Sequence, residues 1–238
     1  MKHFYKTKTR MSKLIQHMGE EWYELLKPII ETDYFKRVGA FVNTGKFNSR
    51  SVYPTGGDIF KPFKLTQPSD VKVVILGNGP DKKDNNLAWS GKDLLNMPSG
   101  LNTILKEVEN SEHDGFKLDQ DPDLTRWAEQ GVLLLNTCLT MEKGKPPLDH
   151  YKVWAKFNKY VIKALSDKFP AIIFMFWGDI PKKLISSVNK DASFILTAPS
   201  PLDVGGFLGN GYFKKSNEVL KEVAISKDLD PTEYQIQW

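Results

Sequence analysis

The chain has 238 residues, with 33 Lys and Arg against 29 Asp and Glu, which gives a formal net charge of +4. A single cysteine, Cys138, excludes an internal disulfide framework and any site that needs several cysteines. No apolar run approaches membrane-spanning length, so we expect no membrane partner. Length favours one domain over residues 1–238, with residues 1–10 as a flexible basic lead-in, and the single cysteine favours the cytoplasm. We expect a monomer. The small positive charge is compatible with a nucleic-acid partner but does not require one.

Helical and loop signals cover most of the chain outside the sheet. Apolar side chains recur at helical spacing over residues 12–40, which predicts one or two amphipathic helices. Residues 43–70 are rich in Pro and Gly and are expected to be mostly loop. Later helices are predicted over residues 101–108, 124–129, 151–168 and 180–188, and coil over residues 228–238.

Four runs of β-branched and other apolar residues each stop at a Gly, a Pro or a polar residue, which is the pattern of buried strands. These runs cover residues 71–80, 131–136, 171–178 and 193–199. Helical patterns separate them, which predicts an α/β fold with a central four-stranded parallel sheet flanked by helices. Because parallel strands end at one edge of a sheet, we expect the functional residues just after the strands.

The loop after the first strand is a candidate site. It contains Asn78, Gly79, Asp81, Lys82 and Asp84. Its place at a strand end favours ligand binding, although a surface loop without a function is also polar. A Met-Pro-Ser-Gly stretch follows and precedes a helix, whose first backbone amides either face a phosphate or form an ordinary helix entrance.

Other polar residues near strand ends have both functional and structural interpretations. The amide of Asn136 carries the donors and the acceptor needed to read the edge of a pyrimidine, but an Asn that ends a strand is also a common turn former. Cys138 has no adjacent base and is expected to be a packed structural cysteine. His150 is expected at the surface. Lys214 and Lys215 either contact a DNA backbone or are only solvated.

Five stretches, in order, resemble the motifs of the family 1 uracil-DNA glycosylases. Residues 73–82 look like the water-activating motif VVILGQDPYH, residues 87–90 like LAFS, residues 98–101 like the PPSL loop, residues 131–137 like GVLLLNT and residues 198–202 like HPSPL. The resemblance implies that family's fold and a DNA partner that contains uracil or a modified pyrimidine. No His, Cys or carboxylate cluster has the spacing of metal ligands, so we expect no metal and no cofactor.

The resemblance also implies roles for individual residues. Trp89 would stack on a flipped base that Asn136 reads, and the other base-binding residues would be Asn78, Gly79 and Lys82. The residues that contact the DNA backbone or its minor groove would be Pro98, Ser99, Gly100, Ala198, Pro199, Ser200, Pro201 and Leu202, joined by Lys214. Leu202 would intercalate where the base leaves the stack.

The departures from the family motifs fall on chemical groups. Gly79 stands where the family has its water-activating Asp, and Ala198 where it has the His that supports the uracil oxyanion. Asp81 replaces the Tyr that excludes a 5-methyl group, and Lys82 replaces the next His. Losing a general base costs about 10²–10⁴ in rate, and losing an oxyanion donor about 10²–10³. We therefore expect ordinary uracil excision to be severely impaired.

Two main hypotheses follow, beside a smaller third possibility of slow residual activity on plain uracil through desolvation and Asn136 alone. The first is a DNA glycosylase whose site accepts a bulky 5-substituted pyrimidine, with room beside Gly79 and with Asp81 or Asp84 as the replacement base. Such an enzyme would act in defence against modified viral DNA. The second is an inactive homologue that binds DNA or serves as a replication accessory protein.

Overall fold

The computed structural model describes residues 13–43, 52–111, 120–142 and 148–238. The predicted lead-in over residues 1–10 lies outside these ranges. Residues 13–18 are helical, and the longer helices are α2 (Glu20–Ile30), α3 (Asp33–Asn43), α5 (Leu101–Ser111), α7 (Leu148–Lys168) and α9 (Tyr212–Ser226). The short helices are α4 (Lys61–Leu65), α6 (Thr125–Ala128), α8 (Asp179–Lys182) and α10 (Pro231–Tyr234), and the 3-10 turns are η1 (Gly56–Phe60), η2 (Pro68–Asp70), η3 (Leu94–Asn96) and η4 (Ile185–Ser187).

Four parallel strands form the central sheet, in the order β3 (Val132–Asn136), β2 (Val73–Gly77), β5 (Ile172–Trp177) and β6 (Ser193–Ala198). The predicted α/β fold with a four-stranded parallel sheet is confirmed. Strands β2, β3 and β5 are buried along their whole length, which explains why their sequences are apolar without alternation. A second, two-stranded sheet pairs β1 (Val52–Tyr53) with β4 (Met141–Glu142).

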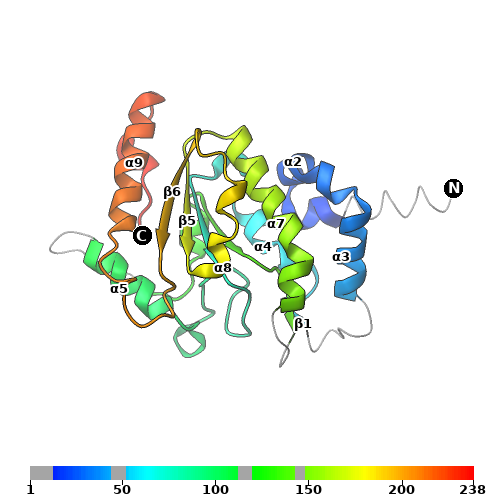
Figure 1. The fold of residues 1–238 in the computed structure, drawn as a ribbon. Coiled ribbons are helices and arrows are strands. Elements are labelled where there is room, and N and C mark those ends of the chain that lie inside the picture. Colours follow the sequence, from blue (N-terminus) through cyan, green and yellow to red (C-terminus); the bar gives the residue numbers. More distant parts are fainter. Residues whose placement is uncertain (1–12, 44–51, 112–119, 143–147) are drawn as a thin grey trace.

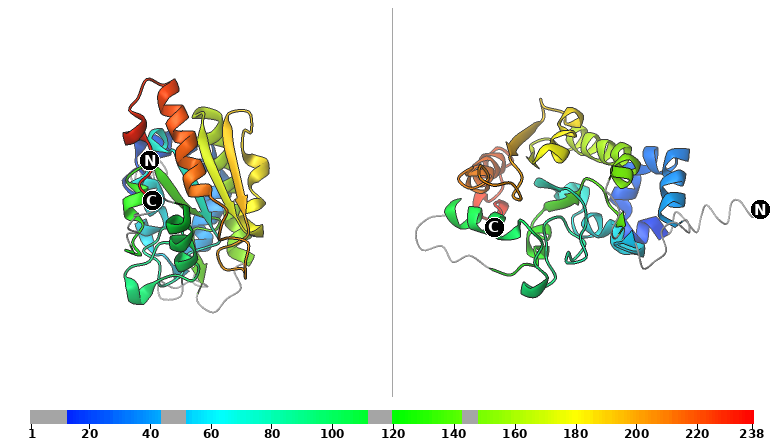
Figure 2. Two further views of the ribbon diagram at one scale, coloured as in Figure 1. Left: turned by 90° about the vertical axis from the view of Figure 1, so that its left-hand side faces the viewer. Right: turned by 60° about the horizontal axis from the view of Figure 1, so that its bottom comes forward.

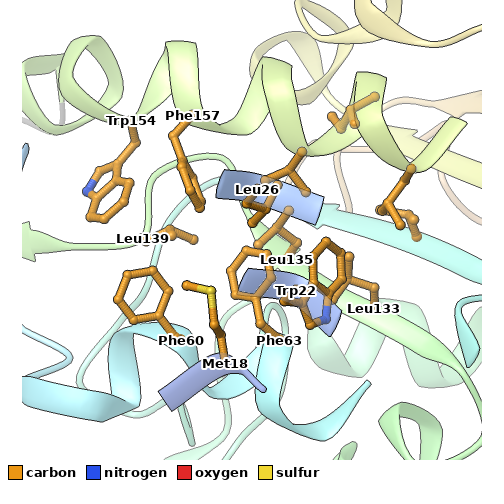
Figure 3. Packing of buried hydrophobic residues seen from close by; sticks show 14 of the residues in the cluster. Met18, Trp22, Leu26, Phe60, Phe63, Leu133, Leu135, Leu139, Trp154 and Phe157 are labelled. Atoms are coloured by element: carbon orange, nitrogen blue, oxygen red, sulfur yellow. The ribbon is translucent and has the colours of Figure 1, made fainter. Parts of the chain in front are cut away.

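Helices cover both faces of the sheet, with α2, α3 and α7 on one side and α5 and α9 on the other (Figure 1). Alternate strand residues face the two layers: Val74 and Leu76 join the first apolar cluster, whereas Val73 and Ile75 join the second. In the first cluster, side chains from helices and from strands pack against one another, and Figure 3 labels ten of them. The two apolar clusters therefore hold the sheet on both faces. They also fix the position of its carboxyl edge, where the loops that follow the strands begin.

Two stretches are more structured than their sequences predict. Within the expected loop, residues 52–70 contain β1, η1, α4 and η2. The tail, expected as coil, contains α10, and Ile236 and Trp238 are buried. The Trp238 ring packs at 4.9 Å on Phe213 and its Nε1 donates to the Phe213 carbonyl at 3.2 Å. These aromatic contacts, which depend on the tertiary fold, hold the tail.

No helix in the described part of the chain is both long enough and apolar enough to cross a membrane.

Candidate functional site

A cavity of about 230 Å³ opens at the carboxyl edge of the sheet. The right-hand view of Figure 2 brings this end of the molecule toward the reader. The cavity is lined by Gly77, Asn78, Gly79, Asp81, Lys83, Asp84, Trp89, Pro98, Ser99, Asn136 and Leu202. Four of the five predicted base-binding residues, all except Lys82, therefore lie together, and the lining as a whole comes from four separate segments of the chain. The volume is below the roughly 300–1,000 Å³ of pockets for drug-sized ligands and suits a small group such as one base.

Asn136 is the last residue of β3 and pairs with Gly77 at the end of β2. A Cβ atom at Gly77 would lie 2.4 Å from Asn136 Oδ1, so the strand end has to be glycine to leave room for this amide. Asn158 Nδ2 donates to the Asn136 and Thr137 carbonyls at 3.2 and 2.7 Å and fixes the backbone. Asn136 lines the cavity, and the hydrogen bonds of the described ranges include none from its side-chain amide, which leaves the amide available to a ligand edge.

Trp89 forms part of the cavity wall and is 7% exposed. Its φ of 64° is unusual for a bulky residue, and this turn of the backbone directs the indole back to β2. The indole Nε1 donates to the Leu76 carbonyl at 3.2 Å, and the ring lies 6.3 Å from that of Trp177. The indole is therefore held in place before any ligand arrives.

Asp84 is a buried acid in the cavity wall. An isolated antiparallel bridge between Asp84 and Gly91 closes the loop, and Asp84 Oδ2 accepts the Asp81 amide hydrogen at 2.7 Å. Burial is the main cause that raises the pKa of Asp84 to about 7, and the neighbouring Asp81 charge adds to it. The hydrogen bond from the Asp81 amide and the charge of Lys92 act in the opposite direction. A carboxyl group that titrates near pH 7 is suited to general acid or base catalysis.

Two other predicted residues of this loop are placed differently from Asp84. Asp81 lines the cavity but is exposed, and its Oδ1 accepts the Lys83 amide hydrogen. Lys82 is exposed and lies outside the cavity lining, and its carbonyl accepts a hydrogen bond from Lys92 Nζ at 3.0 Å. Of the two carboxylates proposed as the base, only Asp84 is withdrawn from solvent.

The room expected beside Gly79 is filled in the direction a side chain would take. A Cβ atom there would lie 2.7 Å from Cys138 Sγ and 3.4 Å from Met141 Sδ. Cys138 is fully buried, and burial raises the pKa of its thiol, as expected for a packed structural cysteine. The thiol of Cys138 and the thioether of Met141 therefore fill the space that a side chain at position 79 would need, and neither residue lines the cavity.

The two loops predicted to contact DNA meet above Trp89. A Cβ atom at Gly100 would lie 3.0 Å from the Trp89 ring, 3.1 Å from Leu202 and 3.3 Å from Pro201. Pro98 and Ser99 line the cavity, and the Leu202 side chain is 50% exposed. The leucine is thus presented to solvent at the cavity mouth, the position that an intercalating side chain needs.

Hydrogen bonds and close packing hold the rest of the second of these loops, which follows β6. Ser200 Oγ accepts the Leu202 amide hydrogen, and Asp203 Oδ2 accepts that of Ser200. A Cβ atom at Gly206 would lie 3.0 Å from Pro199. Ala198 is buried at the end of β6, outside the cavity lining, whereas Lys214 is exposed on α9.

Sequence reasoning missed two residues near the cavity and misplaced a third. Lys83 lines the cavity. Burial raises the pKa of Tyr53, and the charges of Asp81 and Asp84 add to this shift, which places Tyr53 near the same loop. His150, expected at the surface, is buried with Nδ1 2.9 Å from Thr140 Oγ1. For Lys83, its position between Asp81 and Asp84 was the only signal in the sequence that it lines the cavity. Nothing in the sequence indicates the positions of Tyr53 and His150.

No group of three or more His, Cys, Asp or Glu side chains in the described ranges could hold a metal ion.

Comparison with known proteins agrees with the fold. The model of the uracil DNA glycosylase superfamily matches residues 63–221. A uracil-DNA glycosylase of Acinetobacter baumannii (strain AYE) is 33% identical over 234 residues, which cover 95% of each chain. One of Haemophilus influenzae (strain PittEE) is 33% identical over 223 residues, covering 91% of this chain and 100% of its own. The crystal structure of mimivirus uracil-DNA glycosylase superposes with a TM-score of 0.74 at 21% identity, covering 91% of this chain and 86% of that one.

The parallel sheet and its edge cavity thus define a protein with the uracil-DNA glycosylase fold. The family model covers more than half of the chain, and the curated relatives match along nearly all of it. The chain belongs to the uracil-DNA glycosylase superfamily.

Proposed function

We propose that this protein is a DNA glycosylase that draws one pyrimidine nucleotide into the 230 Å³ cavity and hydrolyses its N-glycosidic bond, leaving an abasic site. The observation that carries the proposal is the presence of Asp84 in the cavity wall, a buried carboxyl group with a pKa of about 7, together with the unpaired amide of Asn136.

The roles follow from what each side chain offers. The Trp89 ring stacks on the extruded base, and the Asn136 amide pairs with the base edge and donates a hydrogen bond to the leaving base. The Asp84 carboxylate accepts a proton from water as the water oxygen bonds to C1′ and the bond between C1′ and the base nitrogen breaks. The electron pair of the broken bond leaves with the base, which then takes up a proton. Asp84 supplies the base that Gly79 lacks.

The base is proposed to carry a polar substituent at position 5. Asp81 stands where the family motif has the Tyr that excludes such a substituent, and Asp81 and Lys83 are exposed cavity-lining residues. The cavity is small, so a large substituent has to leave through this polar side of the opening. A sugar on a hydroxymethylated pyrimidine, as used by some viruses, has the hydroxyl groups that these charges would bind. The proposed biological role is defence against such DNA.

The packing behind Gly79 favours a second candidate function. Cys138 Sγ leaves no space there for a catalytic side chain, and Ala198 has no ring to support an oxyanion. A protein with these two features and an idle Asp84 would bind DNA, shield uracil-containing DNA or assist replication without releasing a base.

The test is an incubation of the protein with duplexes that carry uracil, a 5-hydroxymethylated pyrimidine or its glucosylated form, followed by detection of alkali-labile abasic sites. The proposed function predicts cleavage at a substituted base, lost in N136A. The variant D191N, in an exposed loop remote from the cavity, is the control and should act as the wild type. Tight binding with every base left in place would support the second function instead.

A further inference from the structure

Five large apolar side chains are exposed on the loops at the carboxyl edge of the sheet. Leu94 and Leu95 of η3 are 69% and 92% exposed, and Leu202, Val204 and Leu208 are 50%, 107% and 49% exposed. Single exposed apolar residues are ordinary, but several around one pocket indicate an interaction surface. The site described above gives a role to Leu202 and none to the more exposed Leu95.

The turn that carries Leu95 is held by its own hydrogen bonds. Asp93 Oδ1 accepts the amide hydrogens of Leu95 and Asn96, both at 2.9 Å. Asn96 Nδ2 donates to both Asp93 oxygens at 3.0 Å. An apolar side chain presented on a fixed turn loses less conformational entropy on binding than one on a free loop.

This turn lies beside the mouth of the cavity. A Cβ atom at Gly91 would lie 2.9 Å from the Asn96 carbonyl oxygen and 3.0 Å from Pro98, which lines the cavity. Gly100, two residues after Pro98, adjoins Leu202. The segment over residues 98–100 therefore separates the two leucines. Five residues span at most about 18 Å, and base pairs are spaced 3.4 Å along a strand, so both leucines fall within about five or six base steps.

Charge indicates DNA as the partner of this surface. Exposed Lys82, Lys83 and Lys92 lie on the loop that leads into η3. Exposed Lys214 and Lys215 begin α9 after the second loop. Cations on both sides of an apolar rim suit a polyanion with an apolar interior, which is duplex DNA opened at a base step.

We propose that Leu95 is a second apolar wedge, which enters the base stack near the site at which Leu202 replaces the extruded nucleotide. Insertion of apolar side chains between base steps unstacks and kinks DNA, and two such side chains would hold the kink from both ends. This inference rests on the proposed function, because it requires an extruded nucleotide in the cavity.

The test compares dissociation constants, measured by fluorescence anisotropy, for a duplex with a central tetrahydrofuran abasic-site analogue and for the unmodified duplex. The variants are L95A, the conservative L95M, L202A and the control I225A, whose side chain is 61% exposed on α9. We expect L95A to weaken binding of the abasic duplex about tenfold with little change for the unmodified duplex, while L95M and I225A remain close to the wild type. The ratio between L95A and the wild type should not change with salt, because no charge is removed.

Wild-type affinity in L95A, together with weakened binding in L202A, would overturn the second wedge and leave the proposed function intact. An equal loss on both duplexes would also overturn it, because a wedge acts only where the stack is open. A wild-type protein that binds neither duplex would overturn both the wedge and the proposed function. Leu95 is so exposed that thermal unfolding of L95A should match the wild type, which separates loss of contact from loss of fold.

Discussion

Burial distinguishes Asp84 from Asp81, three residues earlier in the same loop. Asp84 is 4% exposed, and one of its oxygens accepts a backbone amide hydrogen, whereas Asp81 is open to solvent. Desolvation disfavours the charged carboxylate, so Asp84 holds a proton to much higher pH than an exposed acid does. The two acids that the sequence presents as equivalent candidates are therefore chemically different.

Substitution of Asp84 should remove catalysis and preserve binding. Asn has nearly the same shape but cannot accept a proton, so D84N should lower the single-turnover rate of base release by about 10²–10⁴. The same measurement on D81N should show a much smaller loss, because Asp81 is solvated. Equal rates for D84N and the wild type would remove Asp84 from the mechanism.

Asp84 should also make stability depend on pH. Its pKa rises from an ordinary 3.8 to about 7 on folding, so the folded state binds more protons than the unfolded state between these values. The contribution of the neutral acid is complete below about pH 4 and is lost as pH rises through 7. The change is at most of the order of 4 kcal/mol. Urea unfolding of the wild type and D84N from pH 4 to 8 measures the difference, and parallel pH profiles would contradict the raised pKa.

At the scale of elements, the turn after β2 is packed against the segment after β3. Gly79 is not in the left-handed region, so the requirement for glycine comes from Cys138 and Met141 behind it. Thr137 Oγ1 donates to the Asn78 carbonyl and strengthens the same contact. Two strand ends are thus joined directly beneath the cavity.

A double-mutant cycle tests this packing. G79A should destabilise the fold by about 1–3 kcal/mol, because the new methyl group overlaps Cys138 Sγ. G79A/C138A should recover part of the loss, because removing the thiol provides the space. Denaturant unfolding of the wild type, both single variants and the double variant gives the coupling energy. Additive effects would show that the two residues are not in contact.

The loop that follows β6 is anchored to α5 by a buried carboxylate. Glu107 is 1% exposed, its Oε1 accepts the Gly211 amide hydrogen at 2.8 Å, and its Oε2 accepts that of Gly209. The Phe207 ring also packs at 5.0 Å on Trp177 in the core. Because α5 begins just after residues 98–100, this helix links the two loops that we propose to contact DNA.

Substitution of Glu107 tests the link. E107Q replaces one acceptor with a donor that faces a backbone N–H group, so it should cost about 1–3 kcal/mol of stability and weaken DNA binding. E109Q, on the exposed side of the same helix, is the matched control. Thermal unfolding and anisotropy titrations measure the two effects, and E107Q values equal to those of E109Q would show that the anchor is dispensable.

At the scale of the whole molecule, the sequence predicts the parts that depend on local pattern. The buried strands are visible as apolar runs, and the structure confirms the predicted four-stranded parallel sheet. The order of its strands was not predicted. The gathering of Asn136, Trp89 and Asp84 around one cavity follows from the parallel arrangement, which brings strand ends to one edge.

Features that depend on distant contacts could not be predicted. Cys138 packs behind Gly79, and Trp238 packs on Trp127. In both pairs the two residues are far apart in the chain. Asp84 is buried and bridges to Gly91, whereas Asp81 is exposed, and no local pattern shows this difference. Packing in three dimensions therefore decides which acid is chemically useful.

The most direct test of the account is mass spectrometry of the free bases released when the purified protein is incubated with duplex DNA that carries a hydroxymethylated or glucosylated pyrimidine. The cavity with Asn136 and Asp84 predicts that the substituted base accumulates with the wild type and is released about 10²–10⁴ times more slowly with D84N. DNA that is bound but yields no free base of any kind would contradict the catalytic role of this site.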